Sequence, residues 1–255
     1  SEECPLIGKL IEEITQGLPE LPHGVFSEIY GGAEVGAILV EQDVDMIWFT
    51  GSSATGKMLH EIASKRLIKT VLEMGGSNPA IIFDDVTVSD ILPRIYQGRF
   101  TNCGQICDAI KRLIVHRNHF DETVEKLADY VSKSRIGYPE ELGTQIGPLA
   151  SMRQLELLDS QVQDSIAQGA KIITGGKRIK EFPGAFYFPT IMTNIKPYMR
   201  VWREEIFGPV LPIISFNSEE EAVQYANDTI YGLGAIVYSK NIERARRIAR
   251  EIDAG

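Results

Sequence analysis

Short runs of β-branched and aliphatic residues alternate along the chain with stretches in which apolar residues recur at the period of a helix. In one such stretch Val124, Leu127, Ala128 and Val131 lie at i, i+3, i+4 and i+7, which places them on a single helix face. Residues 155–166 repeat the same pattern. The alternation of strand-like and helix-like segments predicts an α/β fold.

The pattern also predicts where the individual elements lie. Helices are predicted near residues 5–15, 55–64, 88–98, 120–134, 151–168, 219–227 and 242–252. Strands are predicted at residues 46–50, 70–72, 80–83, 112–116, 171–174, 210–216 and 235–238. Glycine-rich breaks fall at Gly75-Gly76, at residues 137–148 and at residues 175–176. The first break is the predicted domain boundary, which gives one domain at 1–75 and another at 76–255.

Composition narrows the class of protein. A hydrophobic content of 44% and a charged content of 24% are ordinary for a globular domain. A formal charge of -9 argues against a nucleic-acid partner. No apolar run approaches the roughly 18 residues of a membrane span, and the acidic first residues do not resemble a signal peptide. The 3 cysteines are an odd number, so a reducing, cytoplasmic location is predicted.

A glycine loop follows the predicted strand at residues 46–50. The loop reads GSSATG over residues 51–56, and a predicted helix comes next. Glycines at such a turn let backbone N–H groups and the helix dipole meet a phosphate. Gly51, Gly56 and Lys57 fit the G-x-x-x-x-G-K pattern of a nucleotide-hydrolysing P-loop, but Met58 stands where a hydroxyl should reach magnesium. The P-loop is therefore disfavoured, and the loop alone leaves a plain tight turn open.

Two further motifs change this picture. Residues 72–79 read LEMGGSNP, which places Glu73 before a double glycine, and residues 100–107 read FTNCGQIC, which ends on Cys107. Together with the G-S-x-x-x-G loop and the segment EEIFGPV at residues 204–210, they resemble the aldehyde dehydrogenase superfamily in order and approximate spacing. The resemblance covers essentially the whole chain.

The resemblance implies a fold and an activity. It implies the later part of a Rossmann-like cofactor domain, followed by most of an α/β aldehyde dehydrogenase catalytic domain. The implied reaction is oxidation of an aldehyde to a carboxylic acid with NAD or NADP. The residues after Cys107, DAIKR, look closest to semialdehyde-oxidising members such as succinate-semialdehyde dehydrogenases.

The resemblance also assigns roles to individual residues. Cys107 is the implied nucleophile, which passes through a thioester, and its backbone N–H is a candidate oxyanion donor. Glu73 is the implied general base that hydrolyses the thioester; members that transfer the acyl group to coenzyme A generally lack it. Cys103, in the same loop, is assigned a packing role.

The cofactor contacts follow in the same way. Gly51, Ser52 and Gly56 would lie by the pyrophosphate, and Glu205 and Phe207 would hold the nicotinamide half. Glu2 would favour NAD over NADP, because its carboxylate repels a 2′-phosphate. No metal site is predicted, because the 4 histidines and the cysteine pair show no ligand spacing.

Family features that lie upstream and downstream of these motifs are not found in the chain. They include an oxyanion-binding Asn and an oligomerisation hairpin. The full-length protein is expected to be a homodimer or homotetramer whose partner is a small-molecule aldehyde, while residues 1–255 alone are expected to lack activity. A non-catalytic fragment with a binding or assembly role stays open as the alternative.

Overall fold

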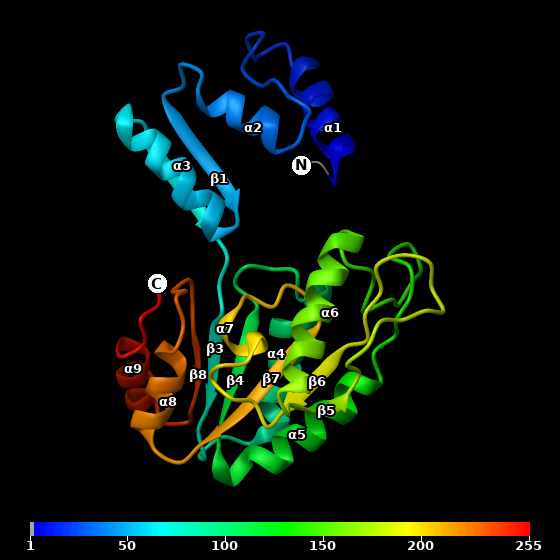
Figure 1. Ribbon diagram of the computed structural model, residues 1–255, viewed down its shortest axis with the longest axis vertical. Helices are drawn as coiled ribbons and strands as arrows, with labels where there is room; N and C mark the ends of the chain where they lie inside the picture. Colours follow the sequence, from blue (N-terminus) through cyan, green and yellow to red (C-terminus); the bar gives the residue numbers. More distant parts are fainter. Residues whose placement is uncertain (1–2) are drawn as a thin grey trace. The chain divides into compact units, whose positions relative to one another are not determined.

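The chain forms two compact units in the computed structural model, which describes residues 3–255. Unit 1 ends at Met74, and unit 2 comprises Gly75–Gly255 (Figure 1). The double glycine Gly75-Gly76 thus begins unit 2. Glu2, the predicted determinant of NAD preference, lies outside the described residues.

Unit 1 is a small βαβ arrangement preceded by two helices. Its elements are α1 (Pro5–Gln16), α2 (Ala33–Val40), β1 (Met46–Gly51), α3 (Ser53–Lys65) and β2 (Lys69–Met74). The two strands pair in parallel, with Thr50 opposite Glu73 and Gly51 opposite Met74. The parallel pairing is possible because α3 supplies the crossover connection.

The core of unit 1 is small. Among its described residues, the fully buried apolar side chains are Ile47, Leu59 and Ala63, which lie on β1 and α3. Helix α1 buries no residue, although its sequence carries a strong apolar stripe. Leu6 on this stripe is 77% exposed and Leu10 is 56% exposed. The apolar face of α1 is therefore turned to solvent.

Unit 2 holds the larger core, built on a mostly parallel sheet. Its helices are α4 (Val88–Phe100), η1 (Thr101–Gly104), α5 (Arg117–Ser132), α6 (Met152–Ala167), α7 (Arg200–Arg203), α8 (Glu219–Asn227) and α9 (Ile242–Arg250). Its strands are β3 (Asn78–Ile82), β4 (Ile110–His116), β5 (Lys171–Thr174), β6 (Thr190–Thr193), β7 (Val210–Phe216) and β8 (Ile236–Tyr238). The described strands are ordered β5-β6-β7-β4-β3-β8, and all neighbours are parallel except β5 and β6 (Figure 1).

Local sequence explains why several of these elements begin and end where they do. Every residue of β3 is buried, as expected for a central strand covered on both faces. Helix α8 begins after Ser218, whose hydroxyl accepts a hydrogen bond from the Glu221 amide at 3.3 Å. The glutamates of its first turn also favour the positive end of the helix dipole. Asn241 caps α9 in the same way, by accepting from the amides of Glu243 and Arg244.

The α/β fold predicted from the sequence is confirmed, and most predicted elements are present. The strands at 171–174 and 210–216 and the helix at 219–227 have the predicted bounds. Helix α5 begins three residues earlier than predicted, at Arg117, because the side chain of His116 caps it by accepting from the Asn118 amide. The sequence prediction omitted α2, the short strand β6 and the four-residue helix α7.

Candidate active site

The glycine loop of unit 1 forms a tight strand-to-helix turn. Strand β1 ends at Gly51, and Ser52 is the N-cap of α3, its Oγ accepting from the Thr55 amide at 3.2 Å. Residues from Ser53 onward are already helical. The P-loop alternative is wrong for this reason, because a phosphate-wrapping loop needs the residues that here form the first helical turn. A short turn at a helix N-terminus still presents backbone N–H groups that suit an anion.

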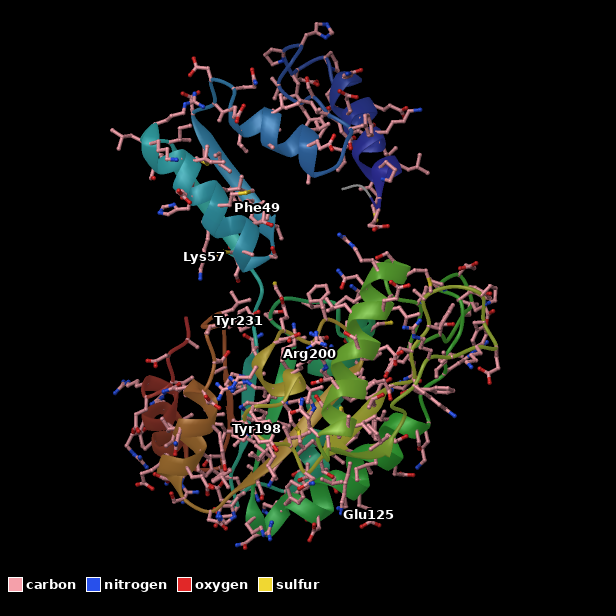
Figure 2. The ribbon with its side chains drawn as sticks, viewed as in Figure 1. Phe49, Lys57, Glu125, Tyr198, Arg200 and Tyr231 are labelled. Atoms are coloured by element: carbon pink, nitrogen blue, oxygen red, sulfur yellow. The ribbon has the colours of Figure 1, made fainter. Side chains whose placement is uncertain are left out.

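Gly56 lies inside the first turns of α3 and is buried. A Cβ atom at this position would lie 2.4 Å from Met74 Sδ, at the end of β2. The residue therefore permits close packing of the helix on the parallel strands, which is the role of the third glycine in dinucleotide-binding fingerprints. Phe49 and Lys57 lie on β1 and α3 of this unit (Figure 2). The predicted pyrophosphate contacts of Gly51, Ser52 and Gly56 stay predictions.

Glu73 is the penultimate residue of β2 and its side chain is exposed. It lies at the carboxyl end of the strand, opposite Thr50 in the parallel ladder. The same edge of unit 1 carries the turn at Gly51 and Ser52. The carboxyl ends of parallel strands are where doubly wound sheets bind ligands.

In unit 2 the predicted site residues lie at the amino ends of the strands rather than at the carboxyl ends. Gly76 stands just before β3, Cys107 just before β4, and Glu205 and Phe207 just before β7. These three strands are parallel neighbours, so their amino ends meet at one edge of the sheet. The structure thus brings Cys107, Glu205 and Phe207 together, although they are distant in sequence.

The loop before Cys107 has an unusual backbone. Asn102, Cys103 and Gly104 all have positive φ, at 50°, 56° and 70°. Asparagine and glycine tolerate this conformation, but for cysteine it is costly and is kept only when the surroundings enforce it. A Cβ atom on Gly104 would lie 2.7 Å from the Gly208 carbonyl oxygen, so the loop lies directly against the segment that follows Phe207.

Cys103 is buried, and its thiol donates to the Gly147 carbonyl at 3.0 Å. Burial raises the pKa of the Cys103 thiol to about 11. A thiol in this environment stays protonated near neutral pH and is a poor nucleophile. Cys107, by contrast, is only partly buried. The packing role predicted for Cys103 fits these observations.

Asn78, the asparagine of the LEMGGSNP motif, fixes the backbone around Cys107. Its side-chain amide donates to the carbonyls of Cys107 at 2.9 Å and Ala109 at 3.0 Å. Its Oδ1 accepts from the Gly234 amide at 3.0 Å. Gly76 allows this approach, because a Cβ there would lie 2.8 Å from the Cys107 carbonyl oxygen. Strand β3 and its preceding glycine therefore hold the Cys107 loop in place.

The segment with Glu205 and Phe207 is held from several elements. Arg99 of α4 is completely buried, and its Nη2 donates to the carbonyls of Ile206 and Gly208, on either side of Phe207. Burial lowers the pKa of Arg99. Within residues 3–255, its Nε and Nη1 have no hydrogen-bond partner. Arg99 therefore acts as an internal clamp on this segment.

Neighbouring side chains add to this clamp. Gln161 of α6 donates to Glu204 Oε2 at 2.8 Å and to the Glu205 carbonyl at 3.3 Å. Arg200 of α7 donates from Nε to Glu204 Oε1 at 2.7 Å. Both oxygens of Glu204 are thus taken up by structural contacts, whereas among the described residues Glu205 is held only through Oε1 by Gly76 and Lys111.

Two features of the described residues fit a dinucleotide. The turn at Gly51 and Ser52 offers helix N-terminal amides to a pyrophosphate. Glu205 Oε2 has no hydrogen-bond partner within the described chain and can accept from ribose hydroxyls. Each feature, within its own unit, suits one part of the expected cofactor.

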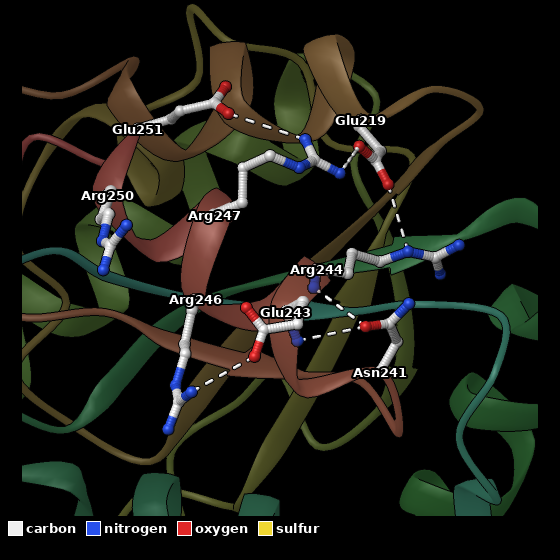
Figure 3. A pocket seen from close by; sticks show the side chains of 8 residues that line it. All are labelled: Glu219, Asn241, Glu243, Arg244, Arg246, Arg247, Arg250 and Glu251. Carbon is white, nitrogen blue, oxygen red and sulfur yellow. Dashed lines mark hydrogen bonds and ion pairs between the residues drawn. The ribbon is translucent and has the colours of Figure 1, made fainter.

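A cavity of about 820 Å³ lies elsewhere, along α9, and is lined by arginines and glutamates (Figure 3). Arg247 pairs with Glu219 at 2.6 Å and Arg246 with Glu243 at 3.3 Å, so most of its charge is internally balanced. None of the predicted site residues lines it. Within residues 3–255 no cluster of His, Cys, Asp or Glu is placed to hold a metal, and no helix there is long and apolar enough to cross a membrane.

Comparison with known proteins decides the family. The model of the aldehyde dehydrogenase family matches residues 1–255. The chain belongs to the aldehyde dehydrogenase family. The resemblance inferred from the motifs is thereby confirmed.

Relatives within the aldehyde dehydrogenase family agree. Peroxisomal aminoaldehyde dehydrogenase 1 of Pisum sativum is 40% identical over 100% of this chain and 50% of its own length. The NADP(+) succinate-semialdehyde dehydrogenase of Deinococcus radiodurans is 37% identical over 100% of this chain and 53% of its own. The Mycobacterium tuberculosis aldehyde dehydrogenase complexed with NAD+ superposes with a TM-score of 0.94 at 35% identity, covering 98% of this chain and 52% of that one. The chain thus spans about half the length of the curated aldehyde dehydrogenases it matches.

Several residues of this aldehyde dehydrogenase site were not singled out from the sequence. Asn78 was part of a recognised motif, but its bonds to the Cys107 loop depend on β3 and β4 being neighbours. Lys111 and Arg99 are buried charges, but β4 and α4 each carry other charged residues, so the sequence of these elements does not show which charge is buried.

Proposed function

We propose that the protein containing this chain oxidises an aldehyde to the corresponding carboxylic acid with NAD+ or NADP+ as oxidant. The observation that carries the proposal is the arrangement of Cys107. It lies partly exposed on a loop that Asn78 fixes from β3, beside a segment that presents Glu205 and Phe207. Membership of the aldehyde dehydrogenase family supports it.

In the first step the Cys107 sulfur bonds to the aldehyde carbon and forms a thiohemiacetal. The carbonyl oxygen gains negative charge, so it needs a hydrogen-bond donor aimed at its new position. The Cys107 backbone N–H makes no hydrogen bond within the described residues and can serve as that donor. The Ile106 carbonyl belongs to the same planar peptide group as this N–H and accepts from Lys111 Nζ at 2.7 Å, which keeps the N–H in a fixed direction.

A bound nicotinamide cofactor would supply the hydride acceptor, and Cys107 would then hold the acyl group as a thioester. Gly51 and Ser52 would hold the cofactor's pyrophosphate through backbone amides of the α3 N-terminus. Glu205 would accept hydrogen bonds from the ribose hydroxyls, and Phe207 would support the nicotinamide half by packing against it.

In the last step Glu73 takes a proton from a water molecule whose oxygen attacks the thioester carbon. The carbon–sulfur bond breaks, which releases the carboxylic acid and restores Cys107. An exposed carboxylate at a strand end suits this role because it is accessible to water. Overall, the aldehyde, water and the oxidised cofactor give the carboxylic acid, the reduced cofactor and one proton.

The names of the relatives indicate the substrate class to test first. They include aminoaldehyde, betaine aldehyde and succinate-semialdehyde dehydrogenases. We propose a short aliphatic aldehyde with a polar or charged far end as the substrate. The choice between NAD and NADP, assembly as a homodimer or homotetramer, and a cytoplasmic location stay predictions.

The direct test is an assay of the full-length protein against a panel of such aldehydes, with NAD+ and NADP+ in parallel. Formation of reduced cofactor together with the carboxylic acid is expected for at least one pair. A Cys107→Ala variant is the control and should form neither product. Absence of turnover with every pair, in a folded protein, would reject the proposed function.

A non-catalytic binding or assembly role is the second candidate. The chain spans about half the length of its relatives, so this role concerns residues 1–255 by themselves. Against it stands the set of contacts that fixes Cys107 and Glu205, which a decayed site would have no reason to keep. Comparing residues 1–255 with the full-length protein in the same assay separates the two candidates.

A further inference from the structure

Lys111 is a buried lysine with a specific set of contacts. It is the second residue of β4, four positions after Cys107, and its side chain is 1% exposed. The ammonium donates to the Ile106 carbonyl at 2.7 Å and to Glu205 Oε1 at 3.2 Å. It also lies 5.1 Å from the centre of the Phe207 ring. One side chain thus touches the Cys107 loop and both residues predicted to hold the nicotinamide half.

The contacts of Lys111 offset the free-energy cost of burying its ammonium group. An ammonium removed from water is costly unless it is paired and its donors are used. Lys111 has three N–H donors, and the carbonyl, the carboxylate and the ring face account for them. Arg99 is a second buried cation nearby that opposes the charge of Lys111. Glu205 is therefore the group that makes the charged form of Lys111 tolerable.

The bonds to Glu205 are divided unevenly between its two oxygens. Oε1 accepts from both Lys111 and the Gly76 amide, the latter at 3.1 Å. Oε2 lies against Gly75, where a Cβ atom would come within 2.1 Å of it, and it has no partner in the part of the chain described. The carboxylate is anchored through one oxygen while the other stays available.

We propose that Lys111 is a positioning residue that fixes the Glu205 carboxylate and the Phe207 ring against the Cys107 loop, so that Glu205 Oε2 is oriented to receive the cofactor ribose. This inference rests on the proposed function, because it assigns Glu205 to the cofactor. A lysine with a purely structural role would be equally buried, but it would not affect cofactor binding through Glu205. The coupling between the two residues is what separates these roles.

The test uses four forms of the full-length protein: wild type, Lys111→Gln, Glu205→Gln and the double variant. Binding of NAD+ and of NADP+ is measured by calorimetry, together with KM, kcat and the melting temperature. Lys111→Gln should weaken binding of the preferred cofactor about tenfold and raise its KM, since a hydrogen bond to a charged group is lost. Lys133→Gln is the matched control, because Lys133 is 71% exposed and pairs only with Asp129 among the described residues.

The double variant distinguishes a positioning role of Lys111 from a purely structural one. If Lys111 acts through Glu205, the double variant should bind the cofactor no more weakly than Glu205→Gln alone. Independent, additive losses would overturn the proposal, and so would unchanged affinity in a folded Lys111→Gln. Cofactor binding can be measured without turnover. If the Lys111→Gln and Glu205→Gln effects on binding are coupled but the protein oxidises no aldehyde, the proposed function is refuted and the positioning role of Lys111 is kept. If the wild-type protein binds neither cofactor, both the proposed function and the proposed role of Lys111 are rejected.

A pH titration gives a second measurement that does not depend on a Lys111 variant folding. Burial and the nearby charge of Arg99 together lower the pKa of Lys111 to about 8, against the opposing effects of Glu205 and Cys107. Tyr231 also lies near Glu205. Below about pH 8 the charged ammonium holds Glu205, and above it the hold weakens. Cofactor affinity in a Cys107→Ala background should therefore fall as pH rises through about 8, and a flat profile would overturn the proposal.

Discussion

At the scale of single residues, the two cysteines of one short loop have opposite environments. Cys103 is buried, donates to the Gly147 carbonyl and has a pKa raised to about 11 by burial. Cys107 is partly exposed, and its carbonyl rather than its thiol is tied down. Because the thiolate is the reactive form, these environments favour Cys107 as the nucleophile that we propose and fit a packing role for Cys103.

This difference predicts the outcome of a matched pair of substitutions. In the full-length protein Cys107→Ala should remove aldehyde oxidation, while Cys103→Ala should keep most of the rate and lose about 1 kcal/mol of stability with its hydrogen bond. Steady-state rates and urea unfolding measure the two effects. An inactive Cys103→Ala beside an active Cys107→Ala would mean that the nucleophile has been assigned to the wrong cysteine.

At the scale of elements, the amino ends of β3, β4 and β7 make the edge on which Cys107 and Glu205 lie. The close approach of the segment before β3 to the Cys107 loop depends on Gly76, which has no space for a side chain. A methyl group there would press on the Cys107 carbonyl oxygen and on Asn78 Oδ1, both at 2.8 Å. Moving these atoms would disturb two hydrogen bonds, from Asn78 Nδ2 to the Cys107 carbonyl oxygen and from the Gly234 amide to Asn78 Oδ1.

Gly76→Ala is therefore expected to destabilise unit 2 by about 1–3 kcal/mol, as overpacking does, and to lower kcat by displacing Cys107. The control is Gly36→Ala in α2, where a Cβ meets nothing within 4 Å among the described residues. That change should be neutral or stabilising by up to about 1 kcal/mol, because alanine favours a helix. Equal effects of the two variants would contradict the close packing at Gly76.

The sequence predicted elements well where the local pattern is strong. The strand at 210–216 and the helix at 219–227 carry β-branched runs, a serine cap and acidic first-turn residues, and their bounds are as predicted. Strand β6 was missed because TIMT is four residues long and becomes a strand only by pairing with β5 and β7. Helix α2 was missed because its apolar residues form a run without helical period.

Some residues of the candidate site could be predicted from the sequence, and others could not. Cys107, Glu73, Glu205 and Phe207 were predicted because they lie in contiguous motifs. Lys111 and Arg99 were not, because no local pattern reveals which charged side chain ends up buried against a carboxylate or a carbonyl. Their roles depend on β4, α4 and the segment before β7 meeting in space.

At the scale of the whole molecule, the two units differ in how much apolar surface they bury. Unit 2 has a continuous core around its six-stranded sheet, whereas the described residues of unit 1 bury only Ile47, Leu59 and Ala63 fully. Apolar residues of α1 such as Leu6, 77% exposed, contribute nothing to the core. Local stability follows buried apolar contact, so unit 1 should open more readily.

Hydrogen exchange on residues 1–255 tests this difference. Amides of β1 and β2 should exchange at least about a hundredfold faster than those of β3 and β4, which corresponds to about 3 kcal/mol between the opening free energies. Mass spectrometry of exchanged peptides resolves the two sets. Equal protection across both units would show that unit 1 is more stable than its small core suggests.

The central claim is that Cys107 carries the acyl group during aldehyde oxidation and that Glu73 releases it. In full-length Glu73→Gln the first half-reaction should survive while hydrolysis nearly stops, giving a burst of reduced cofactor followed by arrest. The most direct measurement is mass spectrometry of this variant, quenched after mixing with substrate and cofactor. The account predicts an acyl adduct on the peptide that contains Cys107, in amount equal to the burst; an adduct on another residue, or a burst with no adduct at all, would contradict it.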